Sequence, residues 1–165
     1  MKRNLTKPIF ILYCMILLWV ILLKMAASLE ELRLLAGNRV INLVPLDYGV
    51  PIGIPQIREA ALNFLLFLPM GVYLKVFGYS GKQVVFRGFC LSLSFEIFQY
   101  ILAIGITDIT DLMTNTLGAA VGAGFYWLLR KLTPDKEKAD RAINTVAITV
   151  ILLFAAMTAL LTIAN

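Results

Sequence analysis

The sequence contains no histidine, and few of its side chains carry charge. Without an imidazole, Ser-His-Asp and Cys-His catalysis and the usual histidine-containing zinc sites are all excluded. Only 15% of the 165 residues are charged, whereas the fraction in an ordinary soluble domain is about a quarter. With 60% apolar residues and a mean hydropathy of +0.85, the composition is that of an integral membrane protein.

The sequence also lacks a disulfide framework and a basic surface. Its two cysteines, Cys14 and Cys90, fall in long apolar runs, where a thiol is most simply a small hydrophobic group. The net charge of +5 comes from lysines and arginines at the ends of apolar segments. Because such cations do not share one face, nucleic acid is not an expected partner. No cofactor and no metal ion is predicted.

Five apolar stretches approach the roughly 20 residues that a helix needs to cross about 30 Å of hydrocarbon. The sequence therefore predicts an all-α, polytopic membrane helix bundle with about five transmembrane helices. The second stretch is short and contains Pro69 and Gly71, which predicts a kink or backbone groups satisfied by neighbouring helices. The stretches are residues 8–27, 60–77, 84–106, 110–129 and 142–163.

The first stretch has two interpretations. Lys2, Arg3 and Lys7 precede an apolar run that ends near the small residues 26–28, as in a secretory signal peptide. An uncleaved anchor is favoured because the run is longer than a usual signal core. In addition, Lys24 near its far end has a stem long enough for its charge to reach the membrane interface.

The distribution of lysine and arginine predicts the orientation, since cytoplasmic loops carry the excess of these residues. With the N-terminus inside, eleven of the fifteen cations lie on the cytoplasmic side. After five spans the C-terminus then faces the outside. The inner connection, residues 133–141, has mixed charge and is expected to be solvated. The four cations on the outer side are Lys24, Arg33, Arg39 and Arg58.

The outer loop, residues 28–59, is too apolar to be left in water and too rich in proline to span. We expect this loop to lie on, or dip into, the outer leaflet.

Polar residues collect on two of the predicted helices. An ionisable group inside a span is costly unless paired, which makes the mid-span Glu96 a functional candidate. At about 100° per residue, its helix places Gly88, Ser92, Glu96, Gln99 and Ala103 in one arc. The next helix repeats the pattern with Asp108, Asp111, Asn115, Gly118 and Gly122, whose glycines allow a close helix approach.

These two polar faces predict a cluster near the outer leaflet, at the level of Arg58 and Asn63. Arg58, Arg39 and Arg33 are the expected charge partners of its carboxylates. Structural roles compete with a functional one: Glu96 and Gln99 as interhelical glue, and the aspartates or Thr110 as caps of the fourth helix. Gly118 and Gly122 are expected to pack within the chain. The oxygens also suit Mg²⁺ or Ca²⁺, but no metal-binding motif is present.

At these residues the chain resembles the VanZ-like family of small bacterial membrane proteins. The resemblance rests on the order and spacing of four segments and covers about residues 39–129. Two departures are Leu46, where the family frequently has an aromatic residue, and Thr107, where a basic residue commonly precedes the aspartate. The segments are Asn42–Leu46, Asn63–Gly71, Glu96–Gln99 and Asp108–Gly118.

The resemblance implies a single membrane domain, residues 1–165, whose core is flanked by anchor helices at 8–27 and 142–163. It also implies a multi-pass protein of the bacterial cytoplasmic membrane with a role in the response to glycopeptide antibiotics of the teicoplanin type. The resemblance adds Asn42 to the predicted cluster. The cluster then consists of Asn42, Arg58, Asn63, Glu96, Gln99, Asp108, Asp111 and Asn115.

Three functions compete for this cluster. The favoured one is non-enzymatic: the cluster binds membrane lipid, a lipid-linked cell-wall precursor or the antibiotic itself at the outer face. A metal-assisted enzyme acting on a lipid head group is the second, with a carboxylate as general base. The third is a small proton-coupled transporter, which the absence of an internal repeat disfavours.

Overall fold

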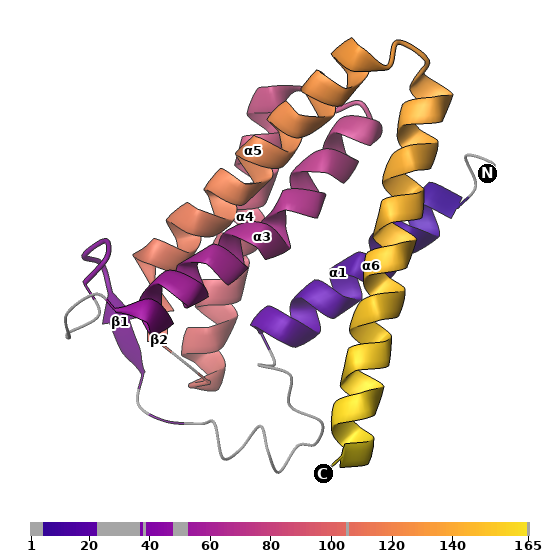
Figure 1. The fold of residues 1–165 in the computed structure, drawn as a ribbon. Helices are drawn as coiled ribbons and strands as arrows, with labels where there is room; N and C mark the ends of the chain where they lie inside the picture. The colour runs from indigo at the N-terminus through magenta and orange to yellow at the C-terminus, as the bar shows by residue number, and fades with distance from the viewer. Residues whose placement is uncertain (1–4, 23–36, 38, 48–52, 105, 165) are drawn as a thin grey trace. The chain divides into compact units, whose positions relative to one another are not determined.

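The computed structural model describes residues 5–22, 37, 39–47, 53–104 and 106–164. These ranges contain five helices and two short strands (Figure 1). The all-α prediction is therefore correct at the level of fold class, with a small sheet added. The elements are α1 (Thr6–Ile21), β1 (Val40–Asn42), α3 (Ile54–Val76), α4 (Gly81–Leu102), β2 (Ile106–Asp108), α5 (Ile109–Leu132) and α6 (Lys136–Ala164).

Three of the described helices are long and apolar enough to cross a membrane: α3, α4 and residues 136–160 of α6. Helix α1 is apolar but has only 16 residues, and positions 23–27 of the predicted first span lie outside the described residues. Helix α5 has 24 residues, but its small and polar side chains lower its hydropathy. Five spans therefore remain a prediction.

Helix α3 begins six residues before the predicted segment 60–77, which places Arg58 within the helix. Its start is determined by Gly53, whose N–H donates to Gln56 Oε1 at 3.0 Å, and by Pro55, which fits a first helical turn. The helix continues through Pro69 without interruption.

Both ends of α4 have local causes. Ser80 caps its start, because the Ser80 hydroxyl accepts from Gln83 N–H and Gln83 Oε1 accepts from Ser80 N–H. The predicted segment, 84–106, is wrong at its far end, since Ala103 adopts a left-handed conformation with φ 56°. Ala103 therefore ends the helix and does not extend its polar arc.

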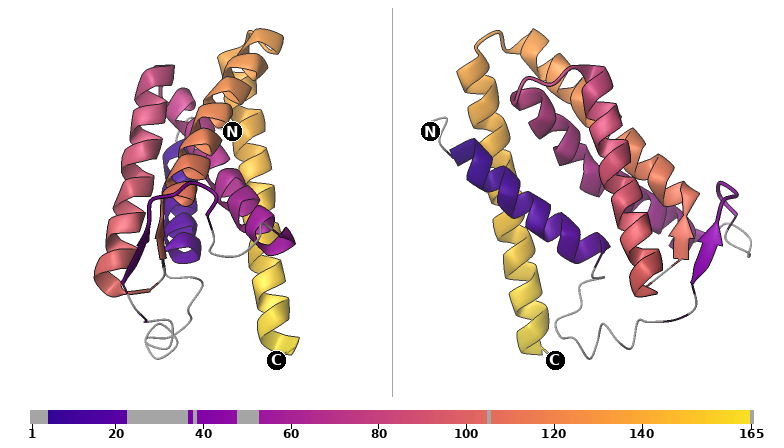
Figure 2. Two further views of the ribbon diagram at one scale, coloured as in Figure 1. Left: turned by 90° about the vertical axis from the view of Figure 1, so that its left-hand side faces the viewer. Right: turned by 180° about the vertical axis from the view of Figure 1, so that it is seen from behind.

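Contacts divide the chain into two compact units, residues 17–128 and residues 1–16 with 129–165. In residues 17–128, α3, α4 and most of α5 lie side by side, and β1 and β2 lie together at one end of them (Figure 2). A Cβ added to Gly118 would lie 2.2 Å from Phe64 O, and one added to Gly122 would lie 2.1 Å from Leu68 O. The glycines thus pack against α3 within the chain, as expected.

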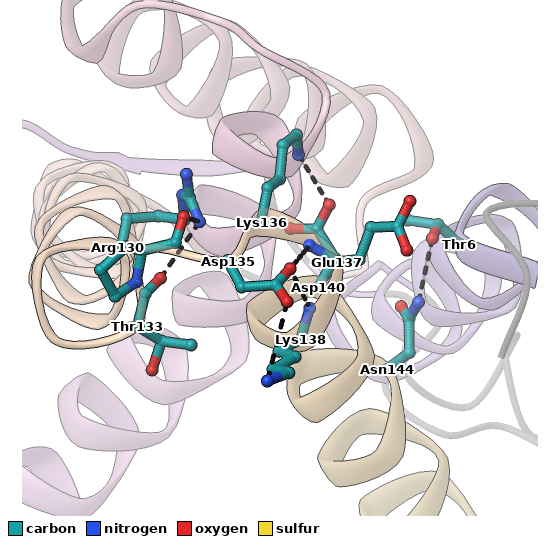
Figure 3. Close-up of polar contacts among 10 residues, drawn as sticks. Thr6, Arg130, Thr133, Asp135, Lys136, Glu137, Lys138, Asp140 and Asn144 are labelled. Carbon is teal, nitrogen blue, oxygen red and sulfur yellow. Dashed lines mark hydrogen bonds and ion pairs between the residues drawn. The ribbon is translucent and has the colours of Figure 1, made fainter.

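The other unit contains the start of α1 and all of α6. Buried Asn144 Nδ2 donates to Thr6 Oγ1 at 2.9 Å, which joins the two helices (Figure 3). Asp135 caps α6 by accepting from the N–H groups of Glu137 and Lys138. The predicted solvated connection, residues 133–141, is shorter than expected, since α6 begins at Lys136, although most of these residues are exposed.

Candidate functional site

The site is built on a parallel pair of three-residue strands. Val40, Ile41 and Asn42 of β1 pair with Ile106, Thr107 and Asp108 of β2. This register joins segments 66 residues apart and places Asn42 opposite Asp108. Residues 40–42 belong to the predicted outer loop, residues 28–59, and strands this short have too little apolar alternation to be recognised.

Asn42, Glu96, Asp108 and Thr110 form what we call the carboxylate network. Asn42 Nδ2 donates to Asp108 Oδ2 at 3.1 Å, and Thr110 N–H donates to Asp108 Oδ1 at 2.7 Å. Asp108 N–H in turn donates to Glu96 Oε2 at 2.9 Å. Donors from β1, β2 and the start of α5 therefore hold two carboxylates close together.

Asp108 has a second role in this geometry. It is the residue before α5, and its contact with Thr110 N–H is that of a helix N-cap. The prediction that Asp108 shares a helical face with Asp111 and Asn115 is wrong, because Asp108 ends β2. Of the residues considered as caps of this helix, the two aspartates and Thr110, it is Asp108 that accepts from the helix N-terminus, while Asp111 lies half-buried in the first turn of α5.

The turn at residues 43–47 is hydrogen-bonded to the network. Asn42 Oδ1 accepts from Val44 N–H at 3.1 Å, and Asn42 Nδ2 also donates to Asp47 O. Leu46 N–H donates to Thr110 Oγ1 at 3.0 Å. Leu46 has φ 61°, an uncommon conformation for a side chain of its size, which this bond helps to hold.

Burial is graded across the network. Glu96 is 3% exposed and Thr110 is 1% exposed, whereas Asn42 and Asp108 are half-buried. The network thus has one open side. Exposed apolar side chains from both strands and the turn surround it: Val40, Ile41, Leu43, Val44, Leu46 and Ile106.

A second polar pair joins α4 to α5. Asn115 Nδ2 donates to Ser92 Oγ at 2.9 Å, and both residues are fully buried. Ser92 precedes Glu96 by one turn of α4. The Oδ1 atom of Asn115 is buried without a hydrogen-bond partner, and so is Gln99 Oε1. Gln99 itself donates through Nε2 to Ile21 O at 3.0 Å.

Two of the predicted arginine partners, Arg39 and Arg58, make no ion pair with these carboxylates among the residues described. Arg39 Nε and Nη2 instead donate to the carbonyls of Tyr100 and Ile101, each at 3.2 Å. These carbonyls lie in the last turn of α4, where Tyr100 O also accepts from Ala103 N–H at 3.2 Å. Arg58 is exposed, and Arg33 lies outside the described residues. The ion pairs within the described ranges, Lys136–Asp140 and Lys138–Asp135, lie near the start of α6.

The structure therefore unites part of the predicted set. Asn42, Glu96 and Asp108 meet directly, and Asn115 contacts the face of α4 that carries Glu96. Asn63 lies half-buried on α3 and makes no hydrogen bond to the network among the residues described. Sequence reasoning missed the contribution of Thr107, whose hydroxyl donates to Glu96 O at 3.1 Å. The signal was available, since threonine and aspartate before an apolar run are typical of a helix start.

Over the described ranges, no group of three His, Cys, Asp or Glu side chains converges as a metal site would require.

Long apolar helices around buried polar groups define the molecule as a helical membrane protein. The chain belongs to the VanZ/LLP1 family, whose model matches residues 10–130. It is 34% identical over 158 residues to Protein VanZ of Enterococcus faecium, and the match covers 93% of this chain and 92% of that protein. The resemblance seen in the sequence is thus confirmed. No solved structure matches the chain.

Proposed function

We propose that this VanZ-family chain is a non-enzymatic, multi-pass protein of the bacterial cytoplasmic membrane that acts in the response to teicoplanin-type antibiotics. It does so by binding an envelope ligand at the carboxylate network. The observation that carries the proposal is the meeting of Asn42, Asp108 and the buried Glu96, from three separate segments, at one open site. Family membership and the similarity to Protein VanZ support the biological context.

The proposed orientation has the N-terminus inside, five crossings and the network at the outer face. Lys75, Lys82 and Arg87 support this, because they lie around the α3–α4 connection, at the opposite end of these helices from the strands. An excess of lysine and arginine marks the cytoplasmic side. Lys75 Nζ donates to Tyr79 O, and the Arg87 guanidinium lies 4.1 Å from the centre of the Tyr79 ring.

The apolar residues around the network support a ligand that is itself amphiphilic. Leu43 is 70% exposed and Val44 is 56% exposed, beside a polar site that is half open. A turn of this kind is stable at the membrane interface, where its side chains enter the acyl boundary and its backbone stays near water. A ligand with its head group at the interface and its tail in the leaflet fits both surfaces.

The test is growth of a susceptible host across teicoplanin and vancomycin series, with expression of wild type, Glu96→Gln, or Asp108→Asn combined with Asp111→Asn. We expect a teicoplanin-selective shift with the wild type that both variants lose. Membrane abundance is measured alongside, so that loss of function is separated from loss of protein.

Asp140→Asn is the matched control, because it removes a carboxylate whose ion pair with Lys136 lies far along the sequence from the network. This variant is expected to retain the shift. A shift that survives both network variants at unchanged abundance would contradict the proposal, and so would no shift with well-expressed wild type.

A further inference from the structure

The open hydrogen-bonding capacity around the carboxylate network is almost entirely acceptor capacity. The two Asp108 oxygens accept from two neutral donors, Asn42 Nδ2 and Thr110 N–H, and within the described part of the chain no cation contacts them. A carboxylate offers about four acceptor sites, so capacity remains on both oxygens. The Arg39 guanidinium, which was the expected charge partner, is bound to backbone carbonyls.

Two buried acceptors without partners lie on either side of Glu96 along α4. Gln99 is 4% exposed and lies one turn after Glu96, on the same buried face. Asn115 is bound to Ser92, which lies one turn before Glu96, so its unpaired Oδ1 lies on the other side. Both unsatisfied atoms are oxygens, and burying such an atom without a donor costs free energy.

We propose that the ligand binds through a protonated primary amine, held by Asp108 and by the unpaired Gln99 Oε1, and that its apolar part lies against the exposed turn at residues 43–47. This inference rests on the proposed function and names the chemical class of its ligand. An ammonium group has one positive charge and three N–H donors, which match a half-buried carboxylate and an acceptor that lacks a donor.

The same features disfavour other head groups. A phosphate or carboxylate group brings acceptors and negative charge to a site that already has both, so repulsion and desolvation oppose its binding. A divalent cation requires about six or more oxygen ligands at once, and competition by Mg²⁺ distinguishes it from an ammonium. An ammonium needs fewer contacts and tolerates the mixture of amide and carboxylate oxygens seen here.

The experiment is native mass spectrometry of the full-length protein in detergent, titrated with three lipids of matched chain length. These are phosphatidylethanolamine, its N-acetylated form, which has no ammonium charge, and phosphatidylglycerol. Ethanolamine and Mg²⁺ are each added alone as competitors. The variants are Asp108→Asn and Gln99→Met, with Asp140→Asn as the control.

We expect phosphatidylethanolamine to bind about tenfold more tightly than the other two lipids, and Asp108→Asn to remove that preference. Gln99→Met should reduce it by a smaller factor, while Asp140→Asn should retain it. Ethanolamine in large excess should displace the lipid, because it has the same ammonium group. Failure of ethanolamine to compete would contradict the amine assignment.

Equal binding of phosphatidylethanolamine and its N-acetylated form would overturn the amine assignment, as would displacement of the lipid by Mg²⁺ at equal concentration. The growth assay separates this failure from that of the proposed function. If growth depends on Asp108 but no amine preference exists, only the amine assignment is wrong. If the amine preference exists but the wild type shifts no growth curve, only the role in antibiotic response is wrong.

Discussion

The two compact units of the chain differ in how their helices pack: glycines bring helices together in residues 17–128, whereas residues 1–16 and 129–165 contain no glycine. In residues 17–128, glycines and polar groups face inward, as in the contacts of Gly118 with α3 and of Asn115 with Ser92. In the other unit, α6 has long apolar side chains that remain exposed, for example Val146 at 63% and Leu153 at 65%. Hydropathy therefore identifies the surface that lipid covers, whereas small and polar residues identify the packed interior.

The units also contain a matched pair of buried asparagines. Asn115 donates to Ser92 and Asn144 donates to Thr6, both at 2.9 Å and both between helices. Only Asn115 lies beside the carboxylate network. Comparing the two therefore separates what an interhelical hydrogen bond contributes to stability from what the network contributes to function.

The largest expected effect is on the helix contact in residues 17–128. Gly118→Ala or Gly122→Ala should destabilise the protein by about 3 kcal/mol or more, because the added Cβ would overlap a carbonyl oxygen of α3 and force the backbones apart. Thermal unfolding in detergent, followed by size-exclusion chromatography, measures the loss of folded protein.

Gly124→Ala is the control for this prediction, because a Cβ at Gly124 would meet nothing within 4 Å. Alanine has the higher helix propensity, so this variant should be neutral or more stable by up to about 1 kcal/mol. Equal unfolding temperatures for all three variants would contradict the packing account.

The matched asparagines give the next effect. Asn115→Leu and Asn144→Leu should each cost about 1 kcal/mol of stability, the usual size of a hydrogen bond between membrane helices. Only Asn115→Leu should also reduce the teicoplanin shift in the growth assay. If both variants lost the teicoplanin shift at equal abundance, the loss would reflect general destabilisation and not a role of Asn115 in the network.

Helix caps test whether a capping side chain contributes the same free energy of unfolding in the two units. Ser80→Ala in α4 and Asp135→Ala in α6 each remove a side chain that accepts from backbone N–H groups. Each should lower stability by about 1 kcal/mol. Ser80→Thr and Asp135→Asn keep the capping oxygen, and should recover most of the loss in the same unfolding measurement.

The smallest effect belongs to the ion pair between Lys136 and Asp140, which are separated by one helical turn at the start of α6. Because the Lys136 side chain is 46% exposed, Lys136→Gln should cost no more than about 0.5 kcal/mol. The difference should shrink further when unfolding is repeated in 1 M salt. A larger loss that is insensitive to salt would contradict this assignment.

Much of the fold was predictable because helices here follow from long apolar runs. The two polar faces were also recognisable, since Glu96, Ser92 and Asn115 recur at helical spacing and are all buried. The ends of helices were less predictable. Asp135 caps α6, so that the helix begins at Lys136, and the left-handed conformation of Ala103 ends α4 early. The spacing of apolar residues along the sequence reveals neither the cap nor the conformation.

Part of the membership of the site was predictable, but the connections between its members were not. Asp108 looked like a helical residue by spacing, although it ends β2 and caps α5. Arg39 looked like a charge partner, although it completes the last turn of α4. Both errors have one cause: the parallel pairing of β1 and β2 depends on contacts between distant segments, which no local pattern in three residues reveals.

The central claim is that the carboxylate network lies at the outer face of the membrane. It is tested by single cysteines at Asp47, beside the network, and at Lys82, near the start of α4, in a background with Cys14→Ala and Cys90→Ala. A membrane-impermeant maleimide should label the cysteine at 47 in intact cells, and the cysteine at 82 only after lysis. Labelling of the cysteine at 82 in intact cells, with that at 47 protected until lysis, would contradict the account.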